Sequence, residues 1–200
     1  MDMLALLHAA WSGLGSIQGK RGTAMFKEER KAPQFDWSHL GDIEWGRPNL
    51  GPQTAVAVYR LMQFTLRDAI ISHTDVATAN RIFYDAGQSA GKAIHEHLLR
   101  NTQDFDRFIA VLQETLRSFA IGILRVESSD LLKHRFVLTV AEDLDCSGLP
   151  MSDELVCTFD EGFIAGLFSA HFGKQFTARE TDCWCTGDRV CRFEVVLVDA

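Results

Sequence analysis

The residues best suited to bind a metal ion lie in the last third of the chain. They are four cysteines and one glutamate: Cys157, Glu180, Cys183, Cys185 and Cys191. A Thr-Gly-Asp sequence at residues 186–188 sits among them and is typical of a tight turn. Thiolates gathered around such a turn suit a tetrahedral metal such as zinc, which binds cysteine sulfur at about 2.3 Å. This segment is therefore a candidate metal site.

A terminal hairpin would bring two of these cysteines together. Residues 174–185 and 189–198 are predicted to form antiparallel strands that pair symmetrically about Gly187. In that register Cys183 sits opposite Cys191, with Cβ atoms about 4.5–5.5 Å apart. Both thiolates could reach one zinc ion, but the same pair could also form a cross-strand disulfide under oxidation. A metal site therefore needs two more ligands.

Three residues compete for the remaining positions. Cys157 is expected near the start of a helix, where free N–H groups and the helix dipole stabilise a thiolate. Glu180 would share a face with Cys183 only if a bulge or kink interrupted the strand near residues 181–182, because residues three apart otherwise point to opposite faces. Cys185 is the rival of Glu180, since it shares a face with Cys183 in a regular strand.

Plain burial is the alternative to metal binding. Cysteine often behaves as a small apolar residue of the core. We expect that role for Cys146 and for Cys185, each taken singly. For the set of Cys157, Cys183 and Cys191, spacing alone leaves metal binding and burial open.

The remaining pattern predicts the elements that position these residues. Apolar residues at helical spacing predict four main helices, over residues 54–72, 76–99, 104–120 and 153–172. Branched or alternating residues predict strands at 121–127 and 135–142, ahead of the terminal hairpin. Strands that follow helices and close on a hairpin indicate an α+β fold with a mostly antiparallel sheet.

Two of the predicted helices carry glycines four residues apart. Gly87 and Gly91 lie in the second helix, and Gly162 and Gly166 lie in the fourth. Each pair falls on one face of its helix, although glycine inside a helix costs about 1 kcal/mol relative to alanine. We therefore expect close helix packing at these positions, in preference to a ligand cavity.

Composition sets limits on the function. The 200 residues, 46% of them hydrophobic and 24% charged, fit one globular domain with a net charge of -7. That charge argues against general nucleic-acid binding. Residues 1–24 lack the positively charged leader of a signal peptide and are predicted to be a weakly structured extension of a domain at 25–200. Five cysteines without such a signal indicate a reducing compartment, so we expect a cytoplasmic protein.

The cysteine segments resemble a known family. The matching residues are Cys157-Thr-Phe-Asp-Glu-Gly-Phe-Ile-Ala-Gly, Glu180-Thr-Asp-Cys183 and Gly187-Asp188-Arg-Val-Cys191-Arg-Phe193-Glu-Val, with Tyr59-Arg60-Leu61, Ala86-Gly87 and Ala90-Gly91 upstream. This pattern resembles the 4-vinyl reductase domain family, whose stand-alone bacterial and archaeal members are predicted hydrocarbon-binding proteins. The resemblance covers most of residues 35–198.

The resemblance implies a zinc site, a fold and an assembly. In the family's aromatic-sensing transcription regulators, three cysteines and one glutamate hold a zinc ion. Those ligands fall on Cys157, Glu180, Cys183 and Cys191, so the resemblance selects Glu180 over Cys185. Four protein ligands leave no open position, and the Zn²⁺ would therefore be structural rather than catalytic. The family also implies a fold like that of TRAPP subunits, and a homodimer.

Family members enclose an apolar pocket, and this chain has aromatic residues that could line one. Each ring taken singly is more simply a core residue. As a set beside the helix glycines, they could surround an apolar ligand. We expect Phe108, Phe136, Phe159 and Phe163 to contact it. The resemblance places Phe136 and Phe108 where phenol sensors carry a Trp and a His that hold a hydroxyl. The ligand should therefore be more apolar than a phenol, such as a hydrocarbon, an acyl chain or a tetrapyrrole edge.

The sequence favours binding over catalysis. A reduction needs an electron source, and the sequence has no dinucleotide-binding glycine-rich loop in a strand–helix context. The acidic residues Asp143, Asp145 and Asp160 are predicted to be solvated. We therefore expect a non-enzymatic small-molecule sensor that signals through a separate partner or carries its ligand. The alternatives are an accessory factor in tetrapyrrole vinyl reduction and a TRAPP-like interaction scaffold without a small ligand.

Overall fold

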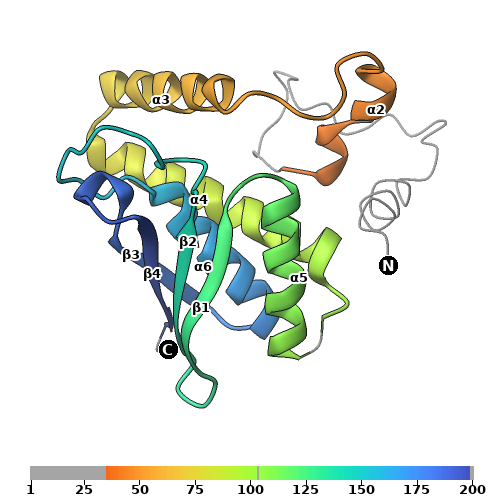
Figure 1. Ribbon diagram of the computed structural model, residues 1–200, viewed down its shortest axis with the longest axis vertical. Helices are drawn as coiled ribbons and strands as arrows, with labels where there is room; N and C mark the ends of the chain where they lie inside the picture. The colour runs from red at the N-terminus through yellow and green to blue at the C-terminus, as the bar shows by residue number, and fades with distance from the viewer. Residues whose placement is uncertain (1–34, 103, 199–200) are drawn as a thin grey trace. The chain divides into compact units, whose positions relative to one another are not determined.

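A computed structural model describes residues 35–102 and 104–198 of the chain. The chain divides into two compact units, Met1–Gln53 and Thr54–Ala200. In the first unit a 3-10 helix, Trp37–Leu40, precedes the short helix α2, Ile43–Gly46. The second unit holds the sheet, the longer helices and all five cysteines (Figure 1). The extension predicted over residues 1–24 lies outside the described residues.

Four main helices belong to the second unit. They are α3 (Val56–His73), α4 (Val76–Ile94), α5 (Phe105–Ser118) and α6 (Thr158–Phe172), and a π-helical turn, His95–Leu99, continues α4. Aspartates begin two of them: the Asp75 carboxylate accepts the Thr78 N–H at 2.8 Å, and the Asp104 carboxylate accepts the Arg107 N–H at 2.7 Å. Such caps satisfy backbone donors that the first turn leaves free. The three helices predicted before the sheet are confirmed.

The fourth helix begins later than predicted, at Thr158 instead of residue 153. Two backbone N–H groups ahead of it, those of Ser152 and Asp153, donate to the carbonyl oxygen of Cys185 at 3.0 and 3.2 Å. Asp153 also adopts a φ of 57°, which a helix does not allow. The segment before α6 therefore packs against the terminal turn instead of continuing the helix.

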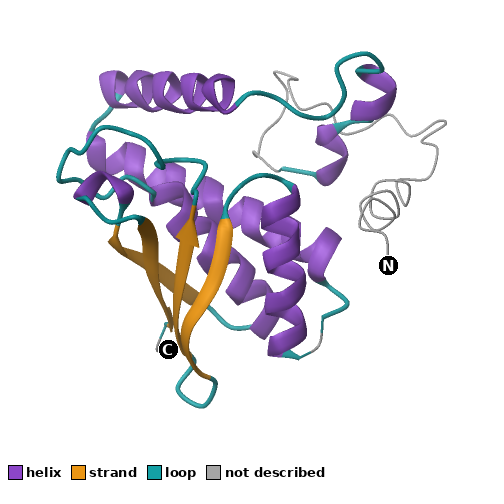
Figure 2. Cartoon of the chain, viewed as in Figure 1, coloured by secondary structure: helices purple, strands orange, loops and turns teal. Residues whose placement is uncertain are grey.

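The strands form one antiparallel sheet. They are β1 (Ile123–Asp130), β2 (Arg135–Ala141), β3 (Phe176–Asp182) and β4 (Val190–Leu197), in the spatial order β1-β2-β4-β3 (Figure 2). The core side chains of β2 alternate: Phe136, Leu138 and Val140 are buried. This alternation is what one covered face requires. The predicted α+β class with a mostly antiparallel sheet is confirmed.

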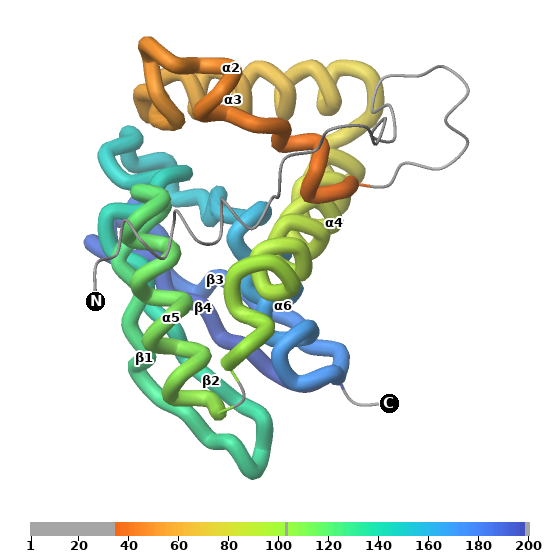
Figure 3. The backbone as a smooth tube through the Cα atoms, turned by 90° about the vertical axis from the view of Figure 1, so that its right-hand side faces the viewer, coloured from red at the N-terminus to blue at the C-terminus, as the bar shows by residue number. Residues whose placement is uncertain are grey.

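The helices cover one face of this sheet in layers. α5 packs on β1, α6 packs on β3 and β4, and α4 packs on the far side of α6 (Figure 3). α6 is consequently enclosed on several sides, and its buried residues run continuously from Gly162 to Phe168. A helix that is apolar around most of its circumference is typical of such a buried position. Among the described residues, no helix has the length and apolarity needed to cross a membrane.

The glycine pairs explain how closely α4 and α6 approach. A Cβ atom added at Gly87 would overlap the carbonyl oxygen of Phe159, and one at Gly166 would overlap that of Gln88. Gly91 and Gly162 face backbone carbonyls of the partner helix in the same way. The predicted close packing is confirmed, because the backbone of one helix fills the space a side chain would need on the other.

Candidate metal centre and adjoining cavity

The predicted cysteines meet where three elements end. Cys157 is the N-cap residue of α6, Cys183 directly follows β3, and Cys191 lies in β4. The Cys157 sulfur lies 3.8 Å from the sulfurs of both Cys183 and Cys191. In a tetrahedron with metal–sulfur bonds of about 2.3 Å, neighbouring sulfurs are about 3.8 Å apart. The three thiols are therefore placed as three corners of a zinc site.

A fourth cysteine joins them. The Cys146 sulfur lies 3.1 Å from that of Cys191, and the ligand atoms of Cys146, Cys157, Cys183 and Cys191 all lie within 4.8 Å of one another. Cys146 is buried as expected, but its place beside the other three thiols was not predicted. It precedes Cys157 by a loop of no regular pattern, so spacing gave no signal for the contact.

Glu180 reaches the cluster through a β-bulge. Glu180 pairs with Phe193 while Asp182 pairs with Arg192, so Thr181 is the extra residue. This is the irregularity near residues 181–182 that a common face for Glu180 and Cys183 requires. Glu180 Oε2 accepts the Cys157 N–H at 3.1 Å, and Glu180 Oε1 is buried without a hydrogen-bond partner. Burial raises the pKa of Glu180 to about 8.

Cys185 lies in a turn rather than in a strand. Residues Trp184–Thr186 form a 3-10 helix, and Gly187 follows with a φ of 99°. The predicted strand over 174–185 therefore stops at Asp182, and Cys185 does not share a strand face with Cys183. Its thiol is buried outside the group of four, and burial raises its pKa to about 11.

The electrostatics of the cluster fit a cation. Hydrogen bonds from Cys146, Cys157 and Cys191 hold the pKa of the Cys183 thiol well below its ordinary value. Contacts with Cys146 and the other thiols raise the pKa of Cys157, and the pKa of Cys191 is raised as well. The sulfurs thus support one thiolate and oppose further ionisation. A divalent metal would supply the missing positive charge, since a coordinating thiol is deprotonated outright.

Helix α3 holds the loop that carries Cys146. The Tyr59 hydroxyl and the Gln63 amide each donate to the Asp145 carboxylate at 2.7 Å. The Arg60 guanidinium donates to the carbonyl oxygens of Leu144 and Ser147, both at 2.8 Å. Burial raises the pKa of Asp145 while the two hydrogen bonds oppose that rise. The metal cluster and α3 are therefore connected through one short loop.

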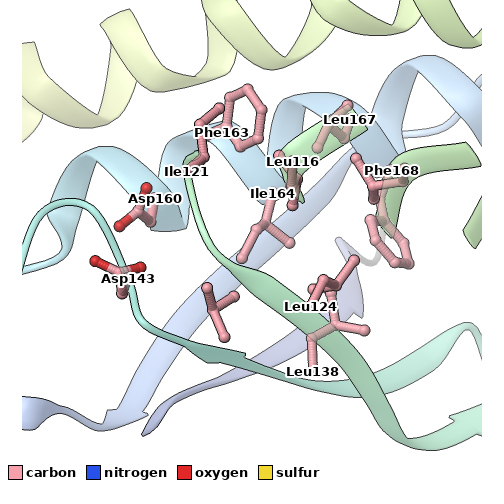
Figure 4. A pocket seen from close by; sticks show the side chains of 12 residues that line it. Leu116, Ile121, Leu124, Leu138, Asp143, Asp160, Phe163, Ile164, Leu167 and Phe168 are labelled. Atoms are coloured by element: carbon pink, nitrogen blue, oxygen red, sulfur yellow. The ribbon is translucent and has the colours of Figure 1, made fainter. Parts of the chain in front are cut away.

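An apolar cavity adjoins the cluster. It is lined by Leu112 and Leu116 of α5, Phe163, Ile164, Leu167 and Phe168 of α6, and Ile121, Leu124, Leu138 and Val140 of the sheet side, with Asp143 and Asp160 (Figure 4). Both carboxyl groups stand at the same end of the cavity (Figure 4). The enclosed space is about 20 Å³, enough for one water molecule and far less than an aromatic ring needs.

The acidic residues at this end are buried, so the prediction that they are solvated was wrong. Asp143 and Asp145 are only 3% and 4% exposed. Asp160 Oδ2 is buried without a hydrogen-bond partner. Burial, together with the charge of Asp145, raises the pKa of Asp143 to about 6, and burial raises the pKa of Asp160 well above its ordinary value. A hydrophobicity pattern could not reveal these burials, because an acidic loop is usually solvated.

Comparison with known proteins identifies the domain that these residues build. Residues 136–197 match the family model of the 4-vinyl reductase domain, and the match spans Cys146, Cys157, Glu180, Cys183 and Cys191. The chain carries a 4-vinyl reductase domain. This confirms the family resemblance seen in the sequence, and it places the whole cysteine cluster inside the matched segment.

Three solved structures share the fold of this chain. A vinyl-4-reductase family protein from Methanocaldococcus jannaschii has a TM-score of 0.57 at 16% identity, covering 84% of this chain and 99% of that one. The phenol-responsive sensory domain of the transcription activator PoxR, with phenol, has a TM-score of 0.56 at 16% identity, covering 72% and 75%. A trafficking protein particle complex subunit 3 from Naegleria fowleri, covalently bound to palmitic acid, has a TM-score of 0.57 at 12% identity, covering 72% and 95%. The predicted TRAPP-like fold is confirmed.

The four phenylalanines expected at the ligand occupy different places in the 4-vinyl reductase domain and its helical cover. Phe163 lines the cavity, and Phe159 stacks on it with ring centroids 6.5 Å apart. Phe108 and Phe136 lie instead in an aromatic cluster, and both contact Phe168, with centroids 5.6 and 5.0 Å apart. Phe168 also lines the cavity. The structure thus brings Phe163 to the cavity wall and sets Phe108 and Phe136 one layer behind it.

Proposed function

We propose that this protein is a non-enzymatic small-molecule-binding protein that takes an apolar ligand into the cavity between α5, α6 and the sheet. The observation that carries the proposal is the cavity itself, which is walled almost entirely by aliphatic and aromatic side chains. Such sites bind by removing apolar surface from water, at roughly 25 cal/mol per Å². The shared fold of the PoxR phenol-responsive sensory domain supports a sensor role.

Ligand binding would require the cavity to widen. The glycine-mediated contact of α4 with α6 leaves little freedom on that side. The polar end differs, because Ala120 and Glu142 flank the cavity-lining residues Ile121 and Asp143 with φ values of 54° and 53°. Residues other than glycine are strained in that conformation. We propose that the cavity opens at this end.

The two buried carboxyls modify the ligand expected from the sequence. Asp143 and Asp160 stand at the end of the cavity where a ligand's polar group would lie (Figure 4). A carboxyl group there favours an apolar body that ends in a hydrogen-bond donor over a pure hydrocarbon. The phenylalanines at positions 108 and 136 leave the opposite end without a polar group of their own.

Mass measurement of the native protein tests the ligand proposal. We expect protein purified from cells to retain a small apolar molecule, and Ile164→Phe, which fills the cavity, to lose it. Ile82→Phe is the matched control, because Ile82 lies on α4, is 42% exposed and does not line the cavity. A retained pigment would instead favour the accessory role in tetrapyrrole reduction. An empty wild-type protein, or equal retention by Ile164→Phe, would contradict a ligand in this cavity.

The proposal includes a structural zinc ion. Three or four buried thiols and a carboxylate form a donor set that suits zinc and leaves no position for substrate. The ion would join the end of β3, the start of β4 and the N-terminus of α6. Metal analysis of protein prepared without chelator should give about one zinc per chain, and less than about half an equivalent would contradict this part of the proposal.

The proposal also includes a homodimer in the cytoplasm. α3 carries exposed apolar side chains, among them Val58, Leu61, Met62 and Leu66. A second copy of the chain could cover them, since contiguous apolar surface usually marks a contact site. Light scattering should give twice the chain mass of 22.4 kDa, and Leu61→Glu should reduce it to that of one chain. Asp68→Glu on the same helix is the control.

A further inference from the structure

We propose that the fourth ligand of the metal in this chain is the Cys146 thiolate and not the Glu180 carboxylate, so that the centre is a four-cysteine site. This inference rests on the proposed zinc ion and assigns its ligands. The family resemblance points to Glu180, whereas the arrangement of the side chains points to Cys146. The choice decides which loops the metal joins.

The sulfur of Cys146 stands where a fourth corner is needed. It lies 3.1 Å from the Cys191 sulfur, and all four sulfurs lie within 4.8 Å of one another. A tetrahedral zinc–thiolate site has sulfurs about 3.8 Å apart, so the closest pair would separate by about 0.7 Å on binding. Rotation of a cysteine side chain achieves a shift of that size without moving the backbone.

The backbone around Cys146 is held in place. The Cys146 N–H donates to Asp143 Oδ1 at 3.2 Å, and the Cys146 carbonyl accepts the Leu149 N–H at 2.9 Å. The Cys146 side chain is completely buried. The contacts from Tyr59, Arg60 and Gln63 fix the same loop from the other side. A fixed, buried thiol this close to three others is a preorganised ligand.

Glu180 already has a separate contact. Its Oε2 accepts the Cys157 N–H at 3.1 Å, and its own N–H donates to Glu161 Oε1 at 2.8 Å. The carboxylate thus orients the backbone of a cysteine ligand, a positioning role that groups around metal sites commonly take. To coordinate the metal through Oε2, Glu180 would have to give up a hydrogen bond to a buried N–H group, and the binding of metal would have to offset that loss.

Zinc chemistry favours the same assignment. Closed structural zinc sites are built from cysteine and histidine, whereas carboxylate ligands are typical of catalytic sites with an open position. When a fourth thiol lies within reach of the ion, a soft thiolate is the better partner for a structural site. The consequence is that the metal binds the loop after β2 directly, and through that loop it is connected to α3.

X-ray absorption of the zinc-loaded full-length protein tests the assignment by counting sulfur neighbours. We expect four sulfurs in the wild type, four in Glu180→Gln, and three sulfurs with one lighter atom in Cys146→Ser. Cys185→Ser is the matched control and should keep four. Cobalt-loaded protein gives a second reading, because the sulfur-to-cobalt absorption should fall in proportion to the thiolates lost in Cys146→Ser alone.

Two results would overturn the inference, and they can be told apart. Three sulfurs and one oxygen in the wild type, with the oxygen changed in Glu180→Gln, would return the fourth position to Glu180 while leaving the proposed zinc intact. A wild-type protein that binds no metal would overturn the zinc proposal together with this assignment. If Cys146→Ser fails to fold, the counts from the wild type and Glu180→Gln still decide between the two ligands.

Discussion

The Tyr59 hydroxyl donates to the Asp145 carboxylate at 2.7 Å and so ties α3 to the loop that carries Cys146. The two residues are far apart in the sequence, and both are largely enclosed. Burial and the neighbouring Asp145 raise the pKa of Tyr59, so this phenol stays protonated as the donor. α3 has few other contacts with the rest of its unit, chiefly those with α4. This hydrogen bond is therefore important for holding both the helix and the loop.

Loss of the Tyr59 hydroxyl should lower the stability of the fold. In Tyr59→Phe the buried Asp145 carboxylate keeps only the donor from Gln63, and we expect a loss of about 1–3 kcal/mol in the free energy of unfolding. Urea unfolding measures it. Tyr84→Phe is the control, because the Tyr84 hydroxyl lies 3.2 Å from the neutral Thr177 hydroxyl and should matter less. A larger loss in Tyr84→Phe than in Tyr59→Phe would contradict the importance of the α3 contact.

Close packing of α4 against α6 predicts a large effect of one methyl group. Gly166→Ala would place a Cβ against the backbone of Gln88, and a backbone cannot rotate away as a side chain can. We expect destabilisation of about 3 kcal/mol, the upper end of the usual cost of overpacking. Ser89→Ala, at an exposed position of α4, should change stability by less than about 0.5 kcal/mol. Equal melting temperatures of the two variants would be evidence against a backbone contact.

The sequence was sufficient for features that depend on local patterns. The helices and strands followed from periodicity, the glycine pairs from their spacing, and the bulge at Thr181 from the need to bring Glu180 and Cys183 to one side. It was insufficient where distant segments decide the outcome. Cys146 joins the cluster only because contacts from α3 hold its loop, and Asp143 is buried only because α6 covers it. Neither contact leaves a periodic signal in the chain.

The pair of histidines behind the aromatic cluster predicts a loss of stability in acid. Burial lowers the pKa of His171 below its ordinary 6.5, with His95 adding to the effect, while Asp104 opposes it. Below pH 6.5 the unfolded chain therefore binds more protons than the folded one, and stability falls as pH falls. His171→Gln should lose less stability than the wild type between about pH 7.5 and about pH 5.5. His73→Gln, at an exposed site, should follow the wild-type slope. Parallel slopes for all three proteins would show that His171 is not held neutral.

Two neighbouring cysteines should differ in their effect on metal binding. Cys183 lies within the group of four sulfurs, whereas Cys185 is buried outside it in the 3-10 turn. We expect Cys183→Ser to bind less zinc and to unfold with a loss of at least about 3 kcal/mol, which corresponds to a melting temperature lower by roughly 6–12 °C.

Cys185→Ser is the matched control for this prediction. It should keep its zinc and lose only the cost of placing a hydroxyl at a buried position, about 1–2 kcal/mol. Removing the metal with a chelator should then lower the melting temperature of the wild type and of Cys185→Ser, but change that of Cys183→Ser very little. If the chelator shifts all three proteins equally, or shifts none, the stability of the fold does not depend on a metal held by Cys183.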